Sequence, residues 1–150
     1  MAGIGEASAI LTVAGAGFSL ASKLKEILDD YKDAAATIEK LREELEATSK
    51  SLQNLGQLAE QNGLQNKNAV ADTRKLTERC QRTISDIRNL LRLESAPSDP
   101  ASSNRETELT RLDRVKWVLS KSKLEVPRAE LGRLKLDIML LYFTLMTLRA

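Results

Sequence analysis

Few side chains in this sequence could carry out acid–base, nucleophilic or metal chemistry. The chain has no histidine and a single cysteine, Cys80, so the commonest general base and metal ligand is missing. One cysteine cannot build a structural zinc site or an internal disulfide, which fits a reducing compartment. Because Cys80 falls between Leu76 and Ile84 in a helical pattern, core packing is favoured over a reactive thiol.

Two further motifs could suggest catalysis or phosphate binding, and neither has the required context. Glu43 and Glu44 are adjacent carboxylates on the charged side of a predicted helix, where surface charge is the better interpretation. Gly15 and Gly17 lie in an apolar helical stretch with no strand before them, which argues against a phosphate-binding loop. We therefore expect no enzymatic activity, no cofactor and no metal site.

Basic side chains gather in the second part of the chain. Residues 1–62 hold six basic and ten acidic side chains, whereas residues 63–150 hold seventeen and eleven. This surplus is either ordinary solvated helix surface or a site for anionic lipid headgroups. Nucleic acid is disfavoured because aromatic residues make up only 3% of the chain and stacking partners are therefore scarce. The candidate headgroup contacts are Arg79, Arg82, Lys116, Lys121 and Lys123.

Apolar residues recur in alternating steps of three and four, which predicts an all-α fold, an up-down bundle of four to five helices. Pro and Ser residues mark one loop at 94–103. Residues 1–150 are expected to form a single domain whose helices span about 5–29, 33–61, 69–93, 104–120 and 126–149. Pro127 suits the first turn of the last helix. The wide apolar face of that helix suggests a central position.

The predicted core follows from the same spacing. Its members lie on the apolar sides of the helices at 33–61, 69–93 and 126–149. They are Leu41, Leu45, Leu52, Ile84, Ile87, Leu134, Ile138, Leu141 and Leu145. The helix at 104–120 also has an apolar side, and the only tryptophan, Trp117, lies within it as a packing residue or an interfacial anchor.

The first helix differs from the others because residues 7–22 contain no charge. No basic residue precedes this stretch, so a signal peptide is rejected, and a buried or membrane-seeking helix is predicted. Since Gly15 and Gly17 should weaken it by roughly 1 kcal/mol each, we expect a helix in a shallow groove, separable from the bundle. The candidate membrane-inserting residues are Ile4, Ile10, Leu11, Val13, Phe18 and Leu20.

Two regions carry a family resemblance. The first is the small-residue opening from Gly3 to Leu20, followed by Leu24, Leu28 and Tyr31. The second runs from Leu112 through the Lys116-Trp117 pair to Leu124, followed by Leu131, Leu134, Lys135 and Ile138. Together they resemble the HeLo-like N-terminal domains of fungal STAND proteins, which are relatives of NLR immune receptors. Those domains are similar to the bundles of plant coiled-coil NLRs and of the mixed-lineage kinase-like pseudokinase.

The resemblance implies an effector of programmed cell death in innate immunity or heterokaryon incompatibility. A C-terminal sensor domain of a longer chain, or a partner NLR, would trigger homo-oligomerisation, and the first helix would then enter membrane. The expected partners are anionic membrane lipids and further copies of the chain, with no nucleic acid. The expected location is cytoplasmic, moving to the plasma membrane on activation. Two alternatives remain: an interaction or signalling bundle without membrane activity, and a scaffold that caps a neighbouring domain.

Overall fold

A computed structural model describes residues 2–30, 35–62, 67–91 and 123–149. These residues form four helices, α1 (Ala2–Asp30), α2 (Ala35–Asn62), α3 (Lys67–Leu91) and α5 (Glu125–Arg149), with no strand in the described ranges. The predicted all-α bundle is confirmed. The predicted loop at 94–103 and the predicted helix at 104–120 lie outside the described residues.

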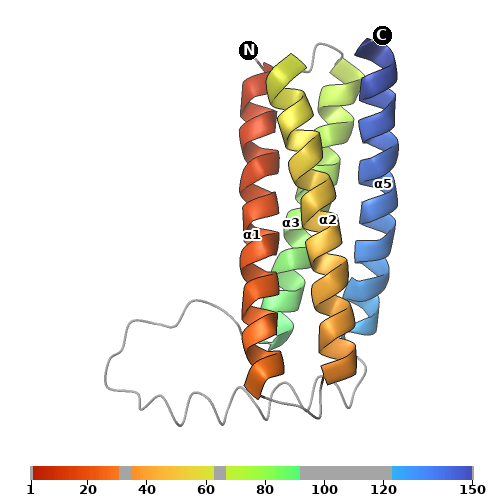
Figure 1. Cartoon of the computed structure of the whole chain (residues 1–150). Helices are drawn as coiled ribbons and strands as arrows, with labels where there is room; N and C mark the ends of the chain where they lie inside the picture. The colour runs from red at the N-terminus through yellow and green to blue at the C-terminus, as the bar shows by residue number, and fades with distance from the viewer. Residues whose placement is uncertain (1, 31–34, 63–66, 92–122, 150) are drawn as a thin grey trace.

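The four described helices pack side by side, and each runs opposite to the described helix before it (Figure 1). Their order around the bundle is not their order along the chain. Both α1 and α5 pack against α2 and α3, so α1 and α5 occupy diagonally opposite corners. Because α1 runs away from one end of the bundle and α5 runs towards it, the start of α1 and the end of α5 lie at that same end (Figure 1).

Local sequence explains why α2 and α5 form where they do. Helix α2 is rich in Leu, Glu and Ala, which favour helix. Arg42 forms ion pairs with Glu39 and Glu46, one turn away on either side. Helix α5 begins with Glu125 at the positive end of the helix dipole. Pro127 lies in its first turn as predicted, where no N–H is needed.

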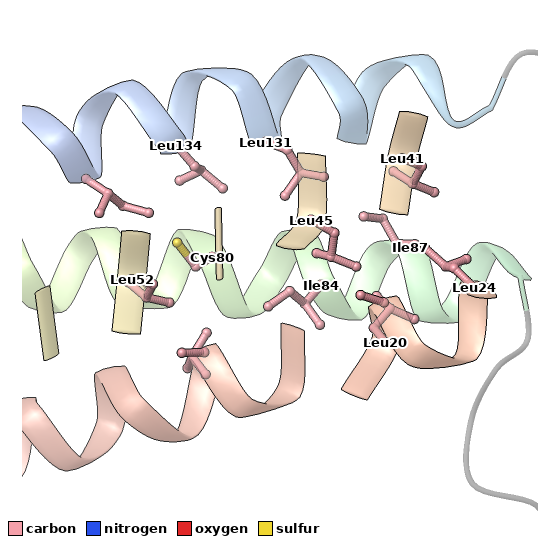
Figure 2. Packing of buried hydrophobic residues seen from close by; sticks show 14 of the residues in the cluster. Leu20, Leu24, Leu41, Leu45, Leu52, Cys80, Ile84, Ile87, Leu131 and Leu134 are labelled. Atoms are coloured by element: carbon pink, nitrogen blue, oxygen red, sulfur yellow. The ribbon is translucent and has the colours of Figure 1, made fainter. Parts of the chain in front are cut away.

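The core runs along the bundle axis (Figure 2) and receives side chains from all four helices. Seven of the nine predicted core residues are buried. They are Leu41, Leu45, Leu52, Ile84, Ile87, Leu134 and Ile138. The other two, Leu141 and Leu145, are only partly buried and pack against the edge of the core, because α5 has neighbours on one side only among the described helices.

Glycine residues set the contact between α1 and α2. A methyl group on Gly17 would collide with the buried Ser49 side chain. A methyl group on Gly56 would lie 2.8 Å from Leu11 Cδ2 and 3.0 Å from Ile10 Cγ2. The two glycines therefore allow these helices to approach closely, and α1 packs more extensively against α2 than against any other described helix.

Among the described helices, α5 does not hold the predicted central position, because it packs against α2 and α3 on one side. The additional apolar residues that widen its face, among them Met139, Phe143 and Met146, are exposed. Tyr142 is half-buried against the core edge and meets the Phe143 ring edge to face, with centroids 5.9 Å apart. The sequence pattern counted apolar positions correctly, but the described neighbours cover only the side that carries Leu131, Leu134 and Ile138.

Candidate functional site

The candidate inserting residues of α1 belong to the bundle core in this structure. Ile10 and Leu20 are fully buried, and Val13 is also buried. Leu11 and Phe18 are half-buried, while the side chain of Ile4 lies outside the described residues. The expectation of a helix held in a shallow groove is wrong, because the glycine contacts with α2 bring these side chains deep between the helices. Any departure of α1 would open the core.

The outward face of α1 is the unusual part of the helix. Its exposed residues before Lys23 are small and uncharged. They are Gly5, Ser8, Ala9, Thr12, Gly15, Ser19 and Ser22. Residues 5–29 form a helix that is long and apolar enough to span a bilayer. Of its most apolar stretch of 18 residues, 44% is buried in the bundle. The described residues contain one such helix.

One ion pair holds the start of α1 against α3. Arg74 Nη2 donates to Glu6 Oε1 at 2.6 Å. The hydrogen bond from Arg74 holds the pKa of the Glu6 carboxyl below its usual value. Burial acts in the opposite direction on the same carboxyl and does not outweigh the hydrogen bond. The ion pair therefore ties the start of α1 to α3.

The candidate headgroup contacts separate into two groups. Arg79 is already occupied, since it donates to Asp137 Oδ2 at 2.8 Å and to Glu130 Oε1 at 3.0 Å. It therefore ties α3 to α5 and is a poor choice for lipid contact. Arg82 and Lys123 are exposed and remain available for an anionic ligand. Lys116 and Lys121 lie outside the described residues.

The space beside Arg82 is a shallow groove between α3 and α5. It has a volume of about 460 Å³, and its lining includes basic side chains such as Arg82 and Arg133 and acidic ones such as Asp86 and Glu125. The mixture gives no strong preference for an anion. A similar groove between α1 and α3 includes Glu6 and Arg74. No group of three or more potential metal ligands occurs within the described helices.

Cys80 lies on the bundle axis (Figure 2) and is buried. Burial raises the pKa of its thiol to about 12, and the nearby Arg79 only partly offsets that effect. The thiol is therefore uncharged at neutral pH and has neither the access nor the ionisation that a nucleophile needs. The sequence interpretation of Cys80 as a packing residue agrees with its burial.

A family model described as the N-terminal region of the pigment biosynthesis cluster protein PigL matches residues 1–125. The chain belongs to the PigL N-terminal family. The match covers α1, α2 and α3 and ends at the first residue of α5. No curated protein and no solved structure shows significant similarity to the chain.

Membership of the PigL N-terminal family places the chain in a group defined by the helical region described above. The matched span includes every candidate inserting residue of α1 and every candidate headgroup contact.

Proposed function

We propose that this PigL N-terminal domain is a membrane-targeting effector bundle that acts without catalysis. In this proposal α1 leaves the bundle and enters lipid when several copies assemble, as the resemblance to HeLo-like domains of fungal NLR-like receptors suggests. The observation that carries the proposal is the outward face of α1, which holds no charge between Glu6 and Lys23. A sensor domain or a partner NLR would supply the trigger for cell death.

The outward face matters because an ordinary surface helix cannot enter lipid without stripping water from its charges. A charged side chain near the middle of a membrane helix costs about 2.5–3.5 kcal/mol on insertion scales. Helix α2 would meet this cost several times over, since Lys40, Glu43, Glu46 and Lys50 are all exposed. Helix α1 would meet none of it from residue 7 to residue 22.

Release of α1 also has a cost, because Ile10, Leu20 and Leu24 leave the core. Burial in lipid replaces burial in protein for these side chains, so the apolar part of the exchange is nearly balanced. Oligomerisation would add the remaining driving force, since several linked helices bind a membrane far more tightly than one. Arg82 and Lys123, with Lys116 and Lys121, would contact anionic headgroups before insertion.

The test is leakage of a dye from anionic vesicles, with two matched substitutions. Ser19→Lys places one charge on the outward face of α1, and Asn54→Lys places the same charge on the outward face of α2. Both positions are exposed, so neither change disturbs the folded bundle. If α1 enters lipid, Ser19→Lys lowers leakage on the order of a hundredfold, from the insertion cost above, and Asn54→Lys leaves it unchanged. Equal leakage from the two variants contradicts the proposal.

Deletion of residues 2–20 is a weaker test than these substitutions. The deletion removes Ile10, Val13 and Leu20 from the core, so loss of leakage would follow from unfolding as readily as from loss of the inserting helix. An exposed position separates the two causes, because its side chain contributes to insertion and hardly at all to folding.

A second candidate is an interaction or signalling bundle without membrane activity. The observation that favours it is the depth at which α1 is packed, with Gly17 against Ser49 and Gly56 against Leu11. If α1 never leaves, both lysine variants behave like the unchanged protein, and vesicles of every composition stay intact. The same leakage assay therefore distinguishes the two functions.

A further inference from the structure

The outward face of α5 carries an apolar stripe that no described helix covers. Its largest members are 61–78% exposed: Val126, Leu136, Leu140 and Phe143. Met139 and Met146, each 40% exposed, lie beside them. Every strongly exposed large hydrophobic residue in the described part of the chain belongs to α5. Exposed apolar residues gathered on one helix in this way normally mark a surface that something else covers.

The described helices cannot supply the cover. Helix α5 packs against α2 and α3 through its opposite side, while α1 stands at the far corner. Arg79 fixes that orientation by its bonds to Glu130 and Asp137. Rotation of α5 to bury the stripe would break both ion pairs and expose Leu134 and Ile138, which are fully buried.

Residues 92–122 of the same chain connect Leu91 to Lys123 and so lead directly into α5. Their sequence predicts a helix at 104–120. Its apolar side consists of Leu109, Leu112, Val115, Val118 and Leu119. Helices joined by a connection as short as 121–124 are usually antiparallel neighbours. Leu124 is buried, which anchors that connection to the base of α5.

The lengths are compatible. A helix over 104–120 would be about 25 Å long, and the stripe from Val126 to Leu140 extends about 21 Å along α5. Residues 92–103 can reach roughly 40 Å when extended, enough to return from the end of α3. We propose that the apolar side of residues 104–120 packs within the same chain against the outward face of α5 from Val126 to Leu140.

If residues 104–120 run antiparallel to α5 about the connection at 121–124, the residues that lie next to each other are determined. Leu109 would lie near Leu136, and Leu112 near Gly132, whose outward side has open space for a side chain. Phe143 lies beyond the end of a helix that starts at 104 and stays exposed. The proposal therefore assigns different environments to Leu136 and Phe143, which have almost the same exposure in the described bundle.

Disulfide trapping in the full chain tests the pairing directly. Two variants carry Leu109→Cys with Leu136→Cys, or Leu112→Cys with Gly132→Cys. The control carries Leu109→Cys with Gly15→Cys, because Gly15 is exposed on α1 with open space around it. Cys80 is left in place, since its buried thiol does not compete. We expect at least one α5 pair to close within single chains under mild oxidation, at least tenfold faster than the control.

Three results would overturn the proposal: both α5 pairs staying reduced, the Gly15 pair closing equally fast, or the α5 pairs linking two copies. The last would mean that a second molecule covers the stripe. Thermal unfolding gives an independent measure, free of any cross-link. Leu136→Lys should lower the melting temperature by several degrees, whereas Phe143→Lys should leave it nearly unchanged. Equal shifts for the two variants would also contradict the proposal.

Discussion

Helices α1 and α2 lie side by side in the bundle (Figure 1), and both bury large aliphatic residues such as Leu20 and Leu45. Their outward faces differ completely. Helix α2 presents Lys40, Glu43 and Lys50 to solvent, as an ordinary surface helix does. Helix α1 presents small neutral residues over its first four turns or more. Inner faces explain how the two helices fold together, and the outer faces indicate which of them could also occupy lipid.

The comparison predicts that the two inner faces contribute equally to stability. Leu20→Ala in α1 and Leu45→Ala in α2 each remove a fully buried side chain, so each should lower the free energy of unfolding by about 2–5 kcal/mol. Urea denaturation followed by circular dichroism measures both values. A near-zero loss of unfolding free energy for Leu20→Ala alone would mean that α1 is only loosely attached. The two inner faces would then not contribute equally to stability.

Two glycines of α1, separated by one residue, sharpen the contrast between its faces. Gly17→Ala should destabilise the bundle, because the new methyl group meets Ser49 at the α2 contact. Gly15→Ala should instead stabilise it, by up to about 1 kcal/mol, because that position has open space and alanine favours helix. Thermal melts of the two variants check the signs. Opposite signs are the expected outcome, and stabilisation by both would place the α1–α2 contact elsewhere.

The outward faces should be equally tolerant of charge while the protein is in water. Ser19→Lys and Asn54→Lys alter exposed positions, and such substitutions change stability by less than about 0.5 kcal/mol. Denaturation without lipid measures this, and a large loss for Ser19→Lys would reveal a partner on that face of α1. The result also validates both variants for the leakage assay.

The smallest effect concerns the ion pair at the start of α1. Because Arg74 lowers the pKa of Glu6, the pair stabilises the fold above the ordinary carboxyl pKa of 4.5 and loses that effect as pH falls through the lowered value. Glu6→Gln should slightly speed amide hydrogen exchange in the first turns of α1 at pH 7. At a pH low enough to protonate Glu6, the variant and the unchanged protein should exchange alike. A persistent difference there would assign the effect to something other than charge.

Sequence patterns predicted the helices well where one narrow apolar stripe faces one core, as in α2 and α3. There, alternating steps of three and four identified Leu41, Leu45, Ile84 and Ile87, and all four are buried. The pattern failed where it depended on neighbours. Nothing in the spacing of α5 says how far along the helix its apolar face is covered, so the partly buried Leu141 and Leu145 could not be told apart from Ile138.

The candidate site was predictable to a lesser degree. The absence of charge from residue 7 to residue 22 singled out α1, but the same sequence could not reveal that Gly17 seats the helix against Ser49. Likewise, a count of basic residues selected Arg79, whose role depends on Glu130 and Asp137 more than fifty positions later in the chain. Pairings between distant segments are set by tertiary structure and leave no local signature.

The diagonal placement of α1 and α5 has a consequence for the order of folding. Helices α1 and α2 adjoin in sequence and in space, so they can associate early as a hairpin with little loss of loop entropy. Helix α5 must instead find α2 across a long separation, as the contact from Thr48 Oγ1 to the Leu131 carbonyl shows. Such non-local pairing slows folding. A nascent chain would therefore hold α1 against α2 before α5 closes the bundle, so the apolar first helix is partly covered from an early stage.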